Sequence, residues 1–273
     1  MNKNVYFTIF SGRQKYLSIL KKYLDKLLEK QLIKEIHLWM YTTDDADVNY
    51  MNAISKNDNR YKLLIPKNPN KKWVYYYNYY YNMYTNENDI IIKCDDDILY
   101  IDIHKFENFI QNMNPTCINF PNIVNNDVCA YYQQQCNIHS LFTYDVTNKI
   151  NEIGVPHPLT NWYTDFNKAY EIHELFLSNP DRFKVDCKYS YGSRISINFF
   201  AISGNAIKEY FKYLNSYDID DEHVIGRLPK ILNNHQIDMN FVVSHFQFGP
   251  QSNDGLLDEL LLKQYDELSN NIE

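Results

Sequence analysis

Three consecutive aspartates, Asp95, Asp96 and Asp97, end an apolar run in the stretch IIIKCDDDILYID, residues 90–102. Adjacent carboxylates repel one another and raise each other's pKa unless a cation neutralises them. In an open α/β sheet, ligands bind beyond the carboxyl ends of the strands. A hard divalent cation, Mg²⁺ or Mn²⁺, held by one or two carboxylates and the phosphates of a substrate is the economical explanation. The alternative is a turn whose acidic residues cap the next helix.

The segment KCDDDILYID, residues 93–102, resembles the D-x-D segment of GT-A fold glycosyltransferases, in which an apolar strand runs into the acidic residues. In that family the segment holds a metal ion on the diphosphate of the sugar donor. The resemblance implies that Asp97 is a direct metal ligand and that Asp95 contacts the ribose or the metal. It assigns Asp96 to the donor sugar.

A second stretch, FTIFSGR at residues 7–13, is similar to the first strand and loop of these enzymes, which line the nucleotide. The resemblance implies that Phe10, Ser11 and Arg13 bind the nucleotide, with Arg13 on the base or a phosphate. A cation is unfavourable at a helix N-terminus, so the position of Arg13 favours a functional role over that of an ordinary surface arginine. Lys72 is a further candidate for contact with phosphate or sugar.

A third stretch, DDEHVIG at residues 220–226, is similar to the E-D-V-x-x-G element of inverting GT-A enzymes. There, a carboxylate near the acceptor acts as general base. The resemblance implies Glu222 as the base, with Asp221 as second choice. The chain departs from the pattern by Glu where many relatives have Asp, and by His223 where they have an apolar residue. The alternative is an acidic helix N-terminus, which is stabilising without any catalysis.

His245, in VVSHF, lies at the end of the last predicted strand. Many GT-A enzymes have a late histidine there as a further metal ligand, so the predicted metal ligands are Asp95, Asp97 and His245. Imidazole suits Mn²⁺ better than Mg²⁺. A histidine with a structural role is the alternative. Asn125 and Asn126 follow a strand end, where they could bind acceptor hydroxyls.

Strand and helix patterns alternate along the first part of the chain, which predicts a doubly wound, mostly parallel sheet of the α/β, GT-A-like class with helices on both faces. The apolar patterns predict strands at residues 4–10, 33–41, 61–66, 89–94, 116–124, 194–203 and 239–248. They predict helices at residues 14–31, 47–55, 70–84, 103–113, 165–179, 205–214, 218–232 and 255–268. The rest of the middle of the chain reads as irregular.

The length of 273 residues suits a single glycosyltransferase domain, with residues 1–124 as the nucleotide-sugar-binding half and residues 125–273 as the acceptor-binding half. A net charge of −7 argues against nucleic acid as a partner. Five cysteines without a CxxC pair predict a reducing compartment and no zinc or disulfide framework. No stretch approaches the roughly 18 apolar residues of a transmembrane helix. We therefore expect a cytoplasmic protein.

The abundance of tyrosine (25 residues), with asparagine, lysine and isoleucine also frequent, favours an AT-rich source such as a giant virus or a low-GC microbe. A viral protein would then act in the host cytoplasm or the virion. There is no GxxxxGK[ST], GxGxxG, GxSxG or HExxH motif, which excludes the usual P-loop, dinucleotide, serine-hydrolase and zinc-protease patterns.

The predicted activity is metal-dependent, inverting transfer of a sugar from a nucleotide-diphosphate sugar to an acceptor hydroxyl. A UDP-sugar is favoured as donor and a GDP-sugar is second. The acceptor would be a glycan, a glycoprotein or a lipid-linked molecule, and the protein a monomer or homodimer. Two alternatives stay open at this point. One is a metal-dependent nucleotidyl or phosphoryl transferase, and the other is an inactive sugar-binding or virion structural protein with the same fold.

Overall fold

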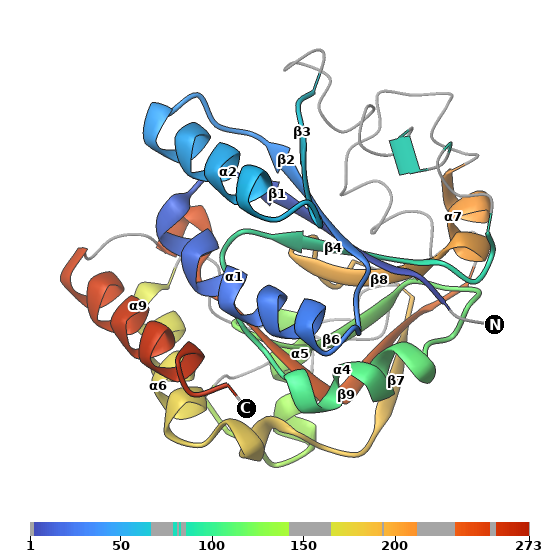
Figure 1. Ribbon diagram of the computed structural model, residues 1–273. Helices are drawn as coiled ribbons and strands as arrows, with labels where there is room; N and C mark the ends of the chain where they lie inside the picture. Colours follow the sequence, from blue (N-terminus) through green and yellow to red (C-terminus); the bar gives the residue numbers. More distant parts are fainter. Residues whose placement is uncertain are drawn as a thin grey trace.

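A computed structural model describes residues 3–66, 79–80, 82, 86–141, 165–192, 194–211, 233–251 and 255–272 (Figure 1). The strands in this part of the chain are β1 (Val5–Ser11), β2 (Glu35–Met40), β3 (Tyr61–Leu64), β4 (Ile90–Asp95), β5 (Ile98–Ile101), β6 (Asn119–Val124), β7 (Lys188–Tyr191), β8 (Phe199–Ser203) and β9 (His235–His245). The helices are α1 (Gln14–Glu29), α2 (Asp45–Asn57), α4 (Ile103–Gln111), α5 (Asp127–Gln135), α6 (Phe166–Ser178), α7 (Gly204–Phe211) and α9 (Gly255–Ser269). Two 3₁₀ turns span Pro180–Phe183 and Gly249–Gln251.

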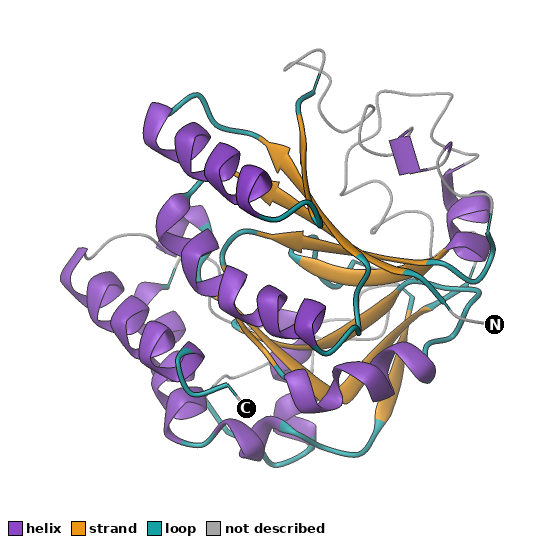
Figure 2. Cartoon of the chain, viewed as in Figure 1, coloured by secondary structure: helices purple, strands orange, loops and turns teal. Residues whose placement is uncertain are grey.

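All the described strands join one sheet in the order β3-β2-β1-β4-β8-β6-β9-β5, with β7 also paired to β9. Strands β1, β2, β3, β4, β6 and β9 run in one direction, and β5, β7 and β8 run against them. Helices flank this sheet (Figure 2). The α/β class with a mostly parallel sheet, predicted from the sequence, is therefore confirmed. Strands from both predicted halves of the chain share the sheet.

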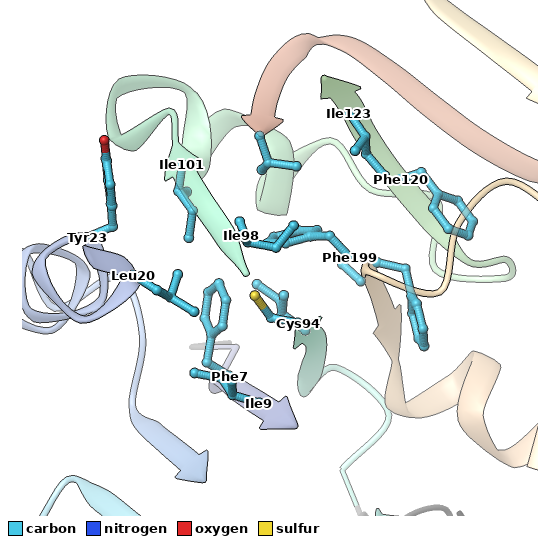
Figure 3. Close-up of a cluster of buried hydrophobic side chains, with 14 of the residues drawn as sticks. Phe7, Ile9, Leu20, Tyr23, Cys94, Ile98, Ile101, Phe120, Ile123 and Phe199 are labelled. Atoms are coloured by element: carbon cyan, nitrogen blue, oxygen red, sulfur yellow. The ribbon is translucent and has the colours of Figure 1, made fainter. Parts of the chain in front are cut away.

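The central strands are apolar along their length because both faces of the sheet are covered. Every residue of β1 is buried. Figure 3 shows Phe7 and Ile9 of β1 in one buried cluster with Ile98 of β5, Phe199 of β8 and Leu20 of α1. The ring of Phe7 lies edge-on to that of Phe199, with centroids 5.9 Å apart. This core fixes the strand ends that carry the polar residues.

Helix α1 follows β1 without a side-chain cap. Its N-cap residue is Arg13, which makes no capping hydrogen bond, and its first turn holds no acidic residue. The helix packs through an apolar stripe at helical spacing, namely Leu17, Leu20, Leu24, Leu27 and Leu28. In Figure 1 it lies along the front of the sheet beside α4. Its N-terminus therefore opens at the carboxyl end of β1, next to the aspartates.

Several element predictions need correction. Strand β5 and helix α5 were not predicted, and β7 lies at the edge of a region that read as irregular. Strand β8 begins only at Phe199, and β9 begins earlier than predicted, at His235. The predicted helix at 218–232 lies outside the described residues, and of that at 70–84 only residues 79, 80 and 82 are described, as helix. None of the helices described is both long and apolar enough to cross a membrane.

Candidate functional site

Strand register brings the loop after β1 to the three aspartates. β1 and β4 are parallel neighbours, and Phe10 pairs with Asp95. The residues that follow each strand, Gly12 and Arg13 on one side and Asp96 on the other, therefore meet at the same edge of the sheet. This is the edge where α/β sheets bind ligands.

The same logic brings His245 to Asp97. The turn at Asp96 and Asp97 leads directly into β5, whose first residue, Ile98, pairs with His245 at the end of β9. The Phe246 backbone N–H donates to the carbonyl of Asp97 over 2.9 Å. Two residues separated by almost 150 positions are thus held together by one antiparallel strand pair.

Asp96 is enclosed by the loop after β1. Its carboxylate accepts hydrogen bonds from the backbone N–H groups of Gly12 (2.8 Å) and Arg13 (2.9 Å), and from Nε of Arg13 (2.9 Å). Nη2 of Arg13 also contacts Oδ1 of the Asp96 carboxylate and forms an ion pair with it. Burial raises the pKa of Asp96 to about 6, although the Arg13 guanidinium opposes the rise. Asp96 therefore holds the loop and its arginine in place.

Asp97 lies between two nitrogen groups. Its Oδ2 is 3.0 Å from Nη2 of Arg13 and 3.6 Å from Nε2 of His245. Burial raises the pKa of Asp97, but the His245 ring and the Arg13 guanidinium outweigh it, and the pKa falls to about 2. Oδ1 of Asp97 and Nδ1 of His245 are both buried and have no hydrogen-bond partner in the described part of the chain. Such unpartnered buried atoms are uncommon and call for an explanation.

Asp95 has different surroundings. Its Oδ1 is 2.5 Å from Nζ of Lys93, and its Oδ2 accepts a hydrogen bond from Nδ2 of Asn198 over 2.9 Å. Lys93 is fully buried, also donates to the carbonyl of Ile197, and lies 4.8 Å above the ring of Phe10. Both carboxylate oxygens of Asp95 are thus already in use.

The predicted nucleotide contacts in the first loop differ in what they touch. The ring of Phe10 contacts Nζ of Lys93. It also packs edge-on against the ring of Tyr41, with the two ring centroids 4.7 Å apart. Ser11 is buried and donates to the carbonyl of Ile9 over 3.3 Å. Arg13 keeps nearly half of its side chain, 46%, exposed. Arg13 is therefore the member of this set with access to a ligand.

Asp97 and His245 fit a divalent cation as two of its ligands. A carboxylate oxygen without a partner and an imidazole nitrogen are suitable donors for Mn²⁺, and such ions commonly take only one or two protein carboxylates beside substrate phosphates. Among the described residues, no group of three or more His, Cys, Asp or Glu side chains is placed to hold a metal. Asp95, the third predicted ligand, is turned toward Lys93 and Asn198.

A buried network supports the His245 end of the site. The carbonyl of Phe246 accepts hydrogen bonds from Nδ2 of Asn125 (2.9 Å) and Nε2 of His173 (2.6 Å). Nδ1 of His173 accepts from the hydroxyl of Tyr265 over 2.7 Å. Asn125 has a φ of 62°, a left-handed conformation that asparagine tolerates better than most residues.

Asn126 caps α5 through the backbone N–H of Cys129 and donates to the carbonyl of Ile195. Like Asn125, it is buried, and its side chain is committed to the protein. The structure thus gives these two asparagines intramolecular hydrogen bonds, and the acceptor contacts stay a prediction.

Lys93 and Asn198 were missed by the sequence analysis. A signal existed for Lys93, because a lysine inside IIIKC is the one charged residue of a buried strand and lies two positions before Asp95, on the same face. Asn198 has no such signal, since only the pairing of β4 with β8 brings it near. Glu222, Asp221 and Lys72 lie outside the described residues, so their roles stay predictions.

A hollow of about 450 Å³ adjoins Arg13. It lies between the starts of α1 and α2 and is lined by Arg13, Gln14, Lys15, Ser18, Asp44 and Asp47. A larger hollow, about 650 Å³, lies at the opposite end of the sheet near Val5 and Lys34. Of these two hollows, only the smaller one borders the edge of the sheet at which Asp95, Asp96 and Asp97 lie.

Comparison with known proteins supports the fold. No protein-family model matches the chain, and no curated protein matches it. Among solved structures, GalNAc-T7 with UDP, GalNAc and Mn²⁺ is similar, with a TM-score of 0.52 and 11% identity over 91% of this chain. The match covers 44% of that protein, so the chain spans less than half of its length.

Two further solved structures match at lower TM-scores. The 4-diphosphocytidyl-2C-methyl-D-erythritol synthase of Anaerococcus prevotii has a TM-score of 0.49 and 10% identity, with 96% of this chain and 97% of that one covered. The inositol-1-phosphate CTP transferase of T. maritima has a TM-score of 0.47 and 11% identity, with 97% of each chain covered. At 11% identity, the similarity to GalNAc-T7 shows a shared GT-A-like fold.

Proposed function

We propose that the protein is a metal-dependent glycosyltransferase that moves a sugar from a nucleotide-diphosphate sugar to an acceptor hydroxyl. The observation that carries the proposal is the Asp97–His245 pair. It has two buried polar atoms without a partner in the described chain, beside an exposed arginine at the carboxyl edge of the sheet. A divalent cation would give the buried donor atoms a partner, and a diphosphate would give one to the exposed arginine.

In this proposal Asp97 and His245 hold Mn²⁺ or Mg²⁺. The ion, when bound, acts as a Lewis acid that stabilises charge on the leaving nucleoside diphosphate. Asp95 belongs to the ribose or to the metal, and its fixed orientation toward Lys93 and Asn198 favours the ribose. Asp96 acts mainly by holding the Arg13 loop, which differs from the direct sugar contact implied by the family resemblance.

The nucleotide would lie along the loop after β1. Arg13 binds a phosphate, and the hollow between α1 and α2 has room for part of the nucleoside. Lys72 adds a second positive charge for phosphate or sugar. The donor is a UDP-sugar by preference and a GDP-sugar as second choice.

The acceptor is activated in the second half of the chain. Glu222, or Asp221 as second choice, removes the proton from an acceptor hydroxyl as it attacks the anomeric carbon. Attack from the face opposite the leaving group predicts inversion. The acceptor is a glycan, a glycoprotein or a lipid-linked molecule.

A metal-dependent nucleotidyl transferase is the second candidate. The favouring observation is that a cation site with an adjacent arginine suits a nucleoside triphosphate as well as a nucleotide sugar. The two functions differ in their products, because nucleotidyl transfer releases pyrophosphate and glycosyl transfer releases a nucleoside diphosphate. An inactive sugar-binding or virion structural protein would release neither.

Product analysis tests the proposal. The protein is incubated with Mn²⁺ and UDP-, GDP-, CMP- or dTDP-sugars, and separately with nucleoside triphosphates and sugar phosphates. We expect nucleoside diphosphate from a nucleotide sugar, and no product from Asp97→Ala. Asp186→Ala, which removes an exposed carboxylate before β7, is the matched control and should behave as the parent. Pyrophosphate as the product would replace the proposal by nucleotidyl transfer.

A further inference from the structure

We infer that Arg13 competes with a divalent cation for the carboxylate of Asp97, and that it thereby makes metal binding conditional on the nucleotide. This inference rests on the proposed function and adds a rule for the order in which the site fills. Nη2 of Arg13 lies 3.0 Å from Oδ2 of Asp97, the same oxygen that faces Nε2 of His245. The arginine thus uses the charge that the metal would use.

The charges of the cluster support this assignment. Asp95, Asp96 and Asp97 carry three negative charges, and Lys93 and Arg13 carry two positive charges in direct contact with them. These five groups leave one net negative charge, and a divalent cation added alone would turn it into a net positive charge. The charges of the cluster are therefore close to balanced by its own residues, so a metal ion by itself gains little.

The exposure of the groups shows which one can move. Lys93 and Asp97 are buried, with side-chain exposures of 1% and 5%, whereas Arg13 is 46% exposed. The guanidinium of Arg13 lies 4.8 Å above the Tyr16 ring, and the residue lines the hollow between α1 and α2. The contact of Nη2 with Asp97 can therefore be exchanged for a phosphate without disturbing the core, while Nε and the backbone N–H of Arg13 stay on Asp96.

A bound diphosphate ends the competition between Arg13 and the cation for the Asp97 carboxylate. It supplies anionic oxygens to which Nη2 of Arg13 can move, and the charge of the Asp97 carboxylate is then no longer neutralised by the guanidinium when the cation binds. Metal and nucleotide then bind with positive coupling, and linkage requires that each raises the affinity of the other by the same factor. In this account the positive sign of the coupling depends on the side chain of Arg13.

Manganese binding by the full chain tests the inference. Free Mn²⁺ is followed by electron paramagnetic resonance, with and without UDP or GDP, for the parent and for Arg13→Gln. We expect the parent to bind Mn²⁺ at least about tenfold more tightly with the nucleotide than without it. Arg13→Gln should bind Mn²⁺ alone more tightly than the parent does, and should lose most of the enhancement by nucleotide.

Two further variants separate this role from net charge and from folding. Arg13→Lys keeps the positive charge and should keep the weak binding of Mn²⁺ alone. Lys30→Gln removes an exposed cation at the opposite end of α1, outside the site, and should leave the affinity for Mn²⁺ alone unchanged. Thermal unfolding of each variant shows whether it is folded.

The outcomes are distinguishable. A parent protein with nucleotide-dependent Mn²⁺ binding, together with an Arg13→Gln variant that binds Mn²⁺ alone no more tightly, overturns the role of Arg13 and leaves the proposed function intact. A Lys30→Gln variant whose affinity for Mn²⁺ alone rises as much as that of Arg13→Gln reduces the effect to net charge and also overturns the role of Arg13. Absence of Mn²⁺ binding in every variant with either nucleotide overturns the metal site, and this inference with it.

Discussion

The two ends of one aspartate run show opposite chemistry. At the β4–β8 side, Asp95 has a partner on each carboxylate oxygen, one of them a fully buried lysine. At the β5–β9 side, Asp97 and His245 each keep a buried polar atom without a partner in the described chain. Removing one partner of a buried ion pair is strongly destabilising, and a buried polar atom without a partner reduces stability. Asp95 therefore has a structural role at this edge of the sheet, whereas Asp97 and His245 have donor atoms that a ligand can use.

Removal of Asp95 should have the largest effect on stability. Asp95→Ala leaves Lys93 as a buried cation without its carboxylate, and we expect a loss of about 3–5 kcal/mol in the free energy of unfolding. Urea denaturation measures it. Adding Lys93→Met to Asp95→Ala should recover a large part of the loss, because the unpaired charge is then gone. A loss for Asp95→Ala no larger than that for Asp97→Ala would erase the contrast between the two sides.

Acid should weaken the protein through His173, which supports the His245 side. Burial lowers the pKa of His173 to about 4, although the Phe246 carbonyl opposes the decrease. The unfolded chain, with a histidine pKa near 6.5, therefore binds the proton first. Stability is complete above that value and falls as the pH drops toward 4, by about 2 kcal/mol between pH 7 and pH 5 for this residue.

Urea denaturation at pH 7 and pH 5 checks the effect of acid. The parent should lose stability between the two values, and His173→Gln should lose about 2 kcal/mol less over the same interval, because it has no proton to gain. Equal losses in the two proteins would show that the buried ring at this position does not titrate as described.

Elements with a local signal in the sequence could be predicted, whereas features that depend on contacts between distant residues could not. Long apolar stretches such as the α1 leucines and the β4 run predicted their elements, because periodicity and burial act over neighbouring residues. Strand β5 was missed because four residues are too few to show a period, and its pairing with β9 is a contact across the chain. The closeness of Asp97 and His245 was predicted only by family resemblance, and the strand register supplies its physical reason.

The orientation of the aspartates could not be predicted from their spacing. Alternation along a strand places neighbours on opposite faces, but the chain leaves β4 at Asp95 and turns before β5. Asp96 is held by backbone N–H groups of the β1 loop, and Asp95 by Asn198 from β8. These partners come from strands that pair only in the folded sheet.

The most direct measurement of the central claim is a metal-dependent thermal shift. The parent, Asp97→Ala and Asp186→Ala are heated with UDP or GDP, with and without Mn²⁺. A nucleotide at 100 times its dissociation constant stabilises a protein by about 2.7 kcal/mol, which is readily detected. The account predicts a Mn²⁺-dependent rise in the midpoint for the parent and for Asp186→Ala, and none for Asp97→Ala. A rise of equal size in Asp97→Ala would contradict it.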